Sequence, residues 1–203
     1  LAIPKRYLSK NIPTLSFHEG FYNKILSSKV STENCLKAFF SKLGVKDFET
    51  IKYDLNLDET ITGLTLKEQV DAYNKCTIKL YTFGYSQGGG LIQILAPYLT
   101  CWTGEYLYGK SFDNKVFNMS HAICFSPARA IGNATTLEVV ENVMGNQNIL
   151  GYCSYADAVP CLPLGKNIGK DPIKEHGMKR LQTIGKAISL VLQDPYKSLL
   201  KTL

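Results

Sequence analysis

The chain of 203 residues can bury one substantial core, and 45% of its residues are apolar, 11% aromatic and 20% charged. This composition excludes a disordered chain and a fibrous repeat. No apolar run approaches the roughly 20 residues of a membrane-spanning helix, so we expect a soluble protein. The net charge is +6, but the basic residues are scattered. Charge therefore identifies no partner, and we expect no nucleic-acid binding.

Six cysteines are too few for a disulfide scaffold of this length, and no Cys-x-x-Cys pair indicates zinc. We expect neither a metal site nor a cofactor. Internal repeats and linker-like tracts are absent from the sequence, so residues 1–203 are predicted to form a single domain. The sequence leaves the oligomeric state and the compartment open, with a secreted or lipid-interface location favoured.

Hydrophobic periodicity predicts helices that alternate with strands. Capping boxes are expected at Ser16–Glu19 and Thr65–Glu68, and Gly44 is expected to end the first helical region. Alternation of this kind predicts an α/β domain with a mostly parallel sheet covered by helices on both faces. The expected elements are a helix over 18–43 in one or two pieces, a helix over 66–75, a strand over 76–83, a helix from 91 that Pro97 kinks or stops, a strand over 118–125, a helix over 135–144, a strand over 148–154 and a helix over 177–193.

The last of these predicted helices is amphipathic. Its polar residues are separated from an apolar stripe, and it stops before Asp194-Pro195, since a residue that precedes proline disfavours helix. The stripe comprises Met178, Leu181, Ile184, Ile188, Val191 and Leu192.

Gly84-Tyr-Ser86-Gln-Gly88 lies between a predicted buried strand and a predicted helix, the context in which Gly-x-Ser-x-Gly forms a nucleophile elbow. The sharp turn strains the serine backbone, and the two flanking glycines present no side chain to collide as strand and helix pack. Ser86 is then exposed above the sheet as a nucleophile. The backbone N–H of Gln87, at the start of the helix, is the expected oxyanion donor.

A serine hydroxyl needs a base, and in this arrangement the chain order is serine, acid, histidine. The sequence has three histidines. His18 precedes the serine, and His121 lies within a predicted strand, where a core or sheet-surface role fits better. We therefore predict His176 as the base, in a loop that can fold back over the elbow.

Asp157 is the preferred acid because it follows a predicted strand directly, where parallel sheets carry their functional loops. Asp171 is the alternative. It is closer to His176 in sequence, but a carboxylate in the same loop is less well fixed for holding one imidazole tautomer.

Four segments resemble the class 3 (fungal-type) triacylglycerol lipases of the α/β-hydrolase fold. They are His18-Glu-Gly-Phe21, Thr82-Phe-Gly-Tyr-Ser-Gln-Gly-Gly89, Ala122-Ile-Cys-Phe-Ser-Pro-Ala-Arg-Ala-Ile-Gly-Asn133 and Asp157-Ala-Val-Pro-Cys-Leu-Pro163. The resemblance runs from about residue 17 to 176. It implies a serine ester hydrolase with Ser86, Asp157 and His176 as nucleophile, acid and base.

The elbow departs from this family at Tyr85 and Gln87, which look more like cutinases, small serine esterases with cysteines around the acid loop. Cys153 and Cys161 bracket Asp157 in a similar way. The pair is either a disulfide in an oxidising compartment or two buried thiols. The short interval from Asp157 to His176 indicates a trimmed C-terminal region.

The family's second oxyanion donor lies on a strand before the block that His18 begins, and none of the 17 preceding residues matches it. We expect that strand to lie upstream of Leu1, which makes this domain N-terminally incomplete, unless another N–H substitutes. Loss of one such donor typically lowers turnover about a hundredfold to a thousandfold.

The leading hypothesis is a serine carboxylic-ester hydrolase acting on a lipid or another acyl ester, with a lipid or membrane surface as a further partner. The aromatic-rich stretch 101–108, with Phe112, is a candidate acyl groove or lipid-interface contact, or it is simply core and rim packing. The alternative is a catalytically inactive binding or scaffold domain, because fold does not guarantee activity. Thioesterase, acyltransferase and peptidase activities remain open, since the same triad serves each.

Overall fold

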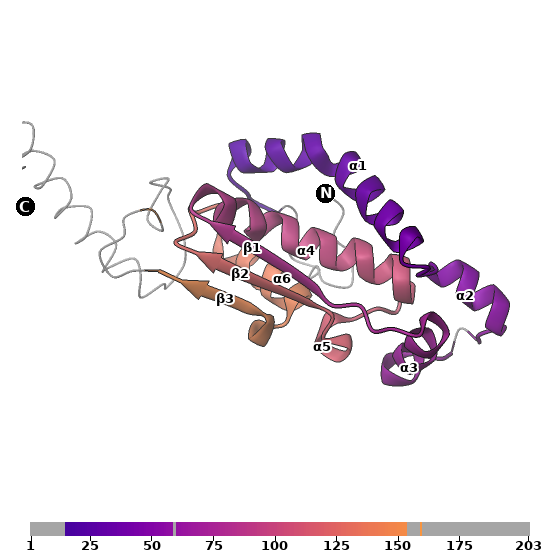
Figure 1. Cartoon of the computed structure of the whole chain (residues 1–203). Coiled ribbons are helices and arrows are strands. Elements are labelled where there is room, and N and C mark those ends of the chain that lie inside the picture. The colour runs from indigo at the N-terminus through magenta and orange to yellow at the C-terminus, as the bar shows by residue number, and fades with distance from the viewer. Residues whose placement is uncertain (1–14, 59, 154–158, 160–203) are drawn as a thin grey trace, which may run out of the picture.

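A computed structural model describes residues 15–58, 60–153 and 159 (Figure 1). Asp157, His176 and the predicted helix over 177–193 lie outside these residues. In chain order the elements are α1 (Glu19–Lys42), α2 (Phe48–Leu55), α3 (Gly63–Asn74), β1 (Leu80–Tyr85), α4 (Gln87–Tyr108), α5 (Asn114–Phe117), β2 (Ser120–Phe125), α6 (Ala134–Met144), the short 3₁₀ helix η2 (Asn146–Asn148) and β3 (Ile149–Tyr152).

The three strands form a parallel sheet in the order β1-β2-β3. Leu80 pairs with Ser120 at one end of β1 and Tyr85 with Phe125 at the other, and Phe125 pairs in turn with Tyr152. All three strands therefore end at the same edge of the sheet. This confirms an α/β domain with a parallel sheet.

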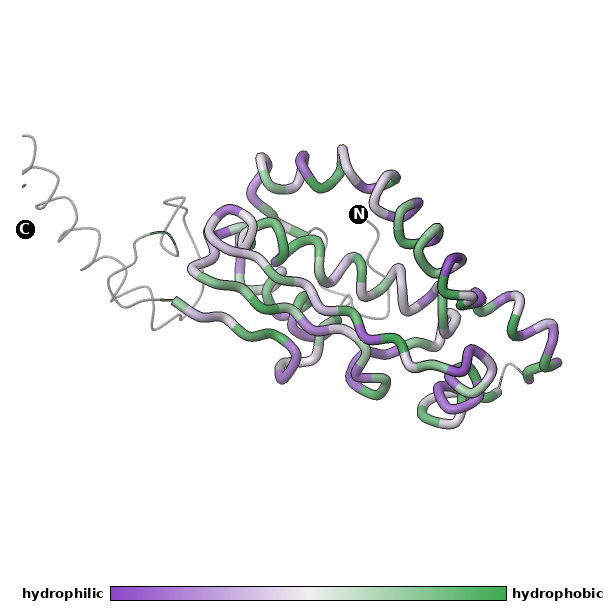
Figure 2. Tube along the Cα trace, viewed as in Figure 1, coloured by the Kyte–Doolittle hydropathy of each residue, from purple (hydrophilic) through white to green (hydrophobic). Residues whose placement is uncertain are grey.

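The described helices that pack on the sheet lie on one face of it. In Figure 1 the strands lie in front of α4 and α6, and α1 packs against α4 rather than against the sheet. Figure 2 shows that α4 is hydrophobic along much of its length, as a helix between a sheet and other helices should be. Within the described residues, helices cover one face of the sheet. The prediction of helices on both faces is therefore confirmed for that face only.

Helix α1 is continuous, and Leu43 and Gly44 end it as expected, with Gly44 at a positive φ of 73°. The predicted capping box at Ser16 and Glu19 is wrong. The residue before the helix is His18, without a side-chain cap. The Ser16 N–H instead donates to Thr136 Oγ1 at 2.8 Å, so a contact distant in sequence replaces the local cap.

The second predicted capping box is also wrong, because α3 begins at Gly63 and follows Thr62 instead of Thr65. Strand β1 begins at Leu80, four residues later than predicted, and runs on through Tyr85. The limits of β1 are set by its pairing with β2, and the sequence around β1 carries no information on that pairing. The later elements β2, α6 and β3 match their predicted ranges to within two residues over the part described.

Helix α4 continues for eleven residues beyond Pro97, so of the two predicted effects of this proline, a kink or a stop, the stop is wrong. Pro97 lacks an N–H and deletes one helical hydrogen bond, an effect that costs about 3 kcal/mol in an exposed helix. Here its neighbours Ala96 and Tyr98 are buried. Tertiary packing therefore maintains the helix through the proline.

Within residues 15–58 and 60–153, the buried side chains form three clusters. One joins α4, β2 and α6 beneath the sheet, and one joins the start of α1 to α4. The largest lies at the opposite end of α4, where α2, α3 and α5 converge on Tyr108, Phe112 and Phe117. The Tyr108 hydroxyl donates to Asp71 at 2.8 Å, and burial raises the pKa of Tyr108 far above its usual value.

A fully buried asparagine, Asn114, joins α5, β2 and α6. Its side-chain nitrogen donates to the carbonyl oxygens of Ser120 at 3.0 Å and Met144 at 2.6 Å. Its side-chain oxygen accepts from the N–H groups of Met119 at 3.0 Å and Ser120 at 2.8 Å. One side chain thus satisfies backbone groups at the start of β2 and the end of α6.

We predict that Asn114→Ala lowers the free energy of unfolding by about 2–4 kcal/mol, because it leaves several buried backbone groups without a partner. Urea denaturation followed by circular dichroism measures this loss. The control is Asn23→Ala, at an exposed position of α1, which should change stability by less than about 0.5 kcal/mol. Equal effects of the two variants would contradict the role assigned to Asn114.

Candidate active site

Ser86 is the single residue between β1 and α4. Its backbone has φ 53° and ψ −118°, a combination that non-glycine residues rarely adopt and that stores strain. The side chain is partly exposed at the edge where the strands end. This geometry confirms the predicted sharp turn from strand to helix with a serine at its apex.

Two glycines allow the close packing around this turn, because a side chain at either position would collide with a neighbouring atom. A Cβ at Gly84 would lie 2.4 Å from the carbonyl oxygen of Gly88, so any side chain there would separate strand from helix. At Gly89 a Cβ would lie 2.9 Å from Cα of Pro127. At Gly88, a Cβ would meet nothing within 4 Å among the described residues. The prediction that Gly88 must lack a side chain to avoid a collision is therefore wrong, and Gly89 is the helix residue with that requirement.

The first turn of α4 points free N–H groups toward the edge that carries Ser86. Residues Gln87, Gly88 and Gly89 occupy the first three helical positions, whose N–H groups have no partner within a helix. The Gln87 N–H, directly after the serine, is in the position of the predicted oxyanion donor.

The loop after β2 is attached to the elbow. The Ala128 N–H donates to the carbonyl oxygen of Ser86 at 3.0 Å, and Gln93 Nε2 donates to the carbonyl oxygen of Ala128 at 3.0 Å. The start of α1 joins them, since the His18 N–H donates to Ala130 at 2.8 Å. Three of the four segments that resemble lipases are therefore joined by hydrogen bonds. Gln93 also takes part in these contacts, and the sequence analysis did not identify it.

The acid and the base predicted from sequence, Asp157 and His176, lie outside the described residues. Strand β3 is the last described strand before Asp157 in the sequence. At its end the Ser126 N–H donates to the carbonyl oxygen of Tyr152 at 2.6 Å. Asp157 follows Tyr152 by five residues in sequence. The segment that carries it therefore leaves the sheet at the edge where Ser86 is located.

His121 lies near the start of β2, opposite Tyr81, and its ring stacks on Tyr81 with the centroids 5.0 Å apart. Four strand residues separate this position from the end of β1, a distance of roughly 13 Å along the strand. Burial, with a smaller effect of Lys79, lowers the pKa of His121. This position confirms His121 as a sheet-surface histidine, too far along the strand to serve Ser86.

The thiol nearest the elbow does not act as a nucleophile. Cys124 is buried, its thiol donates to the carbonyl oxygen of Gly89, and burial raises its pKa to about 11. It is therefore protonated at neutral pH. Cys153 is exposed rather than buried, and its predicted partner Cys161 lies outside the described residues.

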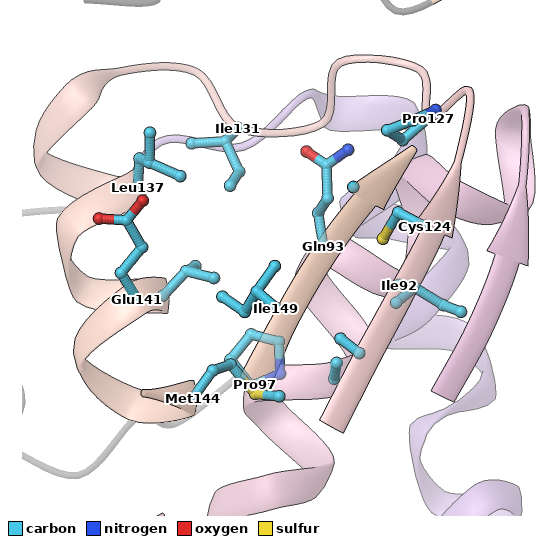
Figure 3. Close-up of a pocket in the computed structure, with 14 residues that line it drawn as sticks. Ile92, Gln93, Pro97, Cys124, Pro127, Ile131, Leu137, Glu141, Met144 and Ile149 are labelled. Atoms are coloured by element: carbon cyan, nitrogen blue, oxygen red, sulfur yellow. The ribbon is translucent and has the colours of Figure 1, made fainter. Parts of the chain in front are cut away.

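An apolar pocket of about 290 Å³ lies between α4, α6 and the sheet, below the loop after β2 (Figure 3). Pro127, which packs on Gly89 of the elbow helix, is one of its lining residues. Gln93 and Glu141 are its polar residues. The sequence analysis did not find this pocket, because the pocket depends on how α6 packs beside α4. Its apolar lining includes Ile92, Cys124, Pro127, Ile131, Leu137 and Ile149.

The aromatic stretch 101–108 does not line an acyl groove at the serine. It forms the second half of α4, and residue 101 lies fifteen residues beyond Ser86, about 22 Å along a helix. Tyr108 and Phe112 are buried in the cluster at the far end of the helix. Core packing is therefore confirmed for Tyr108 and Phe112, while contact of this stretch with a lipid interface stays a prediction.

Comparison with protein-family models, curated proteins and solved structures found no match. In the part of the chain that the structure describes, no helix combines the length and the apolar character needed to cross a membrane. Across residues 15–58 and 60–153, histidine, cysteine and acidic side chains form no group of three suited to a metal ion.

Two neighbouring glycines test the packing of the elbow. We predict that Gly84→Ala lowers the free energy of unfolding by about 1–3 kcal/mol, since its Cβ overlaps backbone atoms that cannot rotate away. Gly88→Ala is the matched control. It should be neutral or slightly stabilising, because alanine favours helix and meets no described atom. Thermal or urea unfolding measures both, and a larger loss at position 88 would contradict this account.

Proposed function

We propose that this protein is a serine carboxylic-ester hydrolase with an α/β-hydrolase-type site. The observation that carries the proposal is Ser86, held at a strained φ of 53° between a parallel strand and the N-terminus of α4. A backbone strained in this way is expected where it has a function. Here it places a serine at the start of a helix whose first N–H groups have no partner within the helix, an arrangement suited to attack on a carbonyl.

In this proposal Ser86 Oγ attacks the ester carbonyl while the imidazole of His176 accepts its proton. Asp157 orients that imidazole, and the Gln87 N–H binds the oxyanion of the tetrahedral intermediate. The protonated His176 then gives the proton to the leaving alkoxide. Water, activated by the same imidazole, releases the acyl group and restores the serine.

Two observations support this assignment of residues. Three lipase-like segments, distant in the chain, meet around the elbow through hydrogen bonds. The fourth, which begins at Asp157, follows β3, whose end adjoins the end of β2 at the same edge of the sheet. The competing function is an inactive binding or scaffold domain that keeps this architecture without the chemistry.

Active-site labelling separates the two functions. We predict that a fluorophosphonate probe labels the 203-residue protein at Ser86, and that Ser86→Ala abolishes labelling. Asp157→Asn and His176→Ala should each slow labelling by about a hundredfold or more, because the hydroxyl then lacks an oriented base.

Ser126→Ala is the matched control for this experiment. Ser126 also has a positive φ, 44°, and also lies at the end of a strand, but it does not begin a helix. Its variant should label like the original protein. Peptide mapping by mass spectrometry locates the label. A label on Ser126 would contradict the assignment of Ser86 as nucleophile, and no label on the complete natural protein would favour the scaffold function.

We also propose that the apolar pocket beside the elbow receives the acyl chain of the ester. The pocket is lined mainly by aliphatic side chains from α4, α6 and the sheet, which suit a hydrocarbon chain. Its connection with the nucleophile is the loop after β2: Pro127 lines the pocket, and the next residue, Ala128, hydrogen-bonds to Ser86. Gln93 and Glu141 are the polar residues of its lining.

Filling this pocket should change the preferred chain length. We predict that Leu137→Trp lowers kcat/KM for long-chain p-nitrophenyl esters about tenfold relative to the acetate ester, because the ring occupies space that the chain would use. Glu138→Trp, at the next and exposed position of α6, is the control and should leave the ratio unchanged. An unchanged ratio in Leu137→Trp would remove the pocket from the acyl site.

A further inference from the structure

The face of the sheet opposite α4 and α6 is uncovered in the described part of the chain. Figure 1 shows the three strands with this face turned to the viewer. Alternate residues of all three strands point from it. Ile123 of the central strand is partly buried, and six other large apolar residues on this face are 44% to 72% exposed. They are Tyr81, Phe83, Tyr85, Phe125, Leu150 and Tyr152.

These side chains form one continuous surface. Tyr81 stacks on Phe83 along β1 at 6.4 Å and on His121 of the neighbouring strand at 5.0 Å. At the other end, Phe125 stacks on Tyr152 of β3 at 5.4 Å. The strand positions on this face include no acidic residue, lysine or arginine. Since parallel sheets bury both faces, a surface of this kind indicates an interior face that requires a cover.

The N-terminal segment is poorly placed to provide this cover. The described chain enters at the other face, where the Ser16 N–H donates to Thr136 of α6 and Phe17 forms a bridge with Ile131. Residues 1–14 also contain two prolines, which oppose a regular helix or strand.

The C-terminal segment meets the requirements. The chain leaves β3 after Tyr152, whose own side chain belongs to the open face. The 24 residues 153–176 can span up to about 80 Å, far more than the width of the sheet. A helix over 177–193 would be about 25 Å long, close to the roughly 20 Å of a six-residue strand.

We propose that residues 177–193 form a helix that docks its apolar stripe on the open face of the sheet. The stripe, from Met178 to Leu192, supplies the aliphatic side chains that the aromatic surface of β1, β2 and β3 lacks. The basic residues Lys179 and Lys186 then remain on the solvent side. This proposal does not depend on ester hydrolysis, because it rests only on the sheet face and the amphipathic pattern.

A photo-cross-linking experiment on the 203-residue protein tests the docking. Phe83, in the middle of β1 on the open face and 62% exposed, is replaced by p-benzoylphenylalanine, which inserts into neighbouring C–H bonds on irradiation. We expect intrachain cross-links, and tryptic mass spectrometry should map most of them to residues 177–193. The same replacement at Phe39, 55% exposed on α1, is the control and should give no cross-link to that segment.

Cross-links from position 83 to a second copy of the chain, or mainly to another segment, would overturn the proposal. A second pair of variants distinguishes docking from chance proximity. Ile184→Glu, within the stripe, should lower Tm by about 5 °C or more, because it introduces a charge into a buried contact. Thr183→Glu, on the opposite side of the predicted helix, should change Tm little. Equal shifts would contradict docking through the stripe.

Discussion

The contact between Gly84 and Gly88 is the constraint on which the candidate site depends. Strand and helix approach so closely that a single Cβ would collide with backbone, and this approach places Ser86 at a positive φ. Because α4 begins at this turn, the same contact directs a helix that packs on β1, β2, α1 and α6. The nucleophile is thus positioned by the element that also organises the core.

The two ends of α4 have different roles. Near the elbow its glycines allow the loop after β2 and the ring of Phe21 to approach the backbone, since a Cβ at Gly90 would lie 2.9 Å from that ring. At the other end, a Cβ at Gly104 would lie 2.1 Å from the Phe112 ring, which packs tightly in the large cluster. The free-energy cost of the strained backbone at Ser86 is therefore offset by the burial of side chains some 30 Å away along the helix.

The order and type of the longer described elements could be predicted from sequence because periodicity and the glycine-rich turn are local signals, whereas the short helices α2 and α5 were not predicted. Failures occurred where a distant residue decided the outcome. Ser16 bonds to Thr136 instead of capping α1, and buried neighbours allow α4 to pass through Pro97. At the site, the pentapeptide identified Ser86 and Gly84, but Gly89 is constrained by Pro127, thirty-eight residues further on. No local pattern contains that contact.

The two main proposals concern the same C-terminal region but depend on different atoms. Among the described residues, the hydrogen bonds that hold the elbow join residues between His18 and Ala130. A parallel sheet with one bare aromatic face, by contrast, is incomplete as a core. If residues 177–193 cover that face, the segment that completes the core begins directly after His176. The base would then be fixed by the burial of the helix that follows it, and folding of the C-terminal region and assembly of the triad would be a single event.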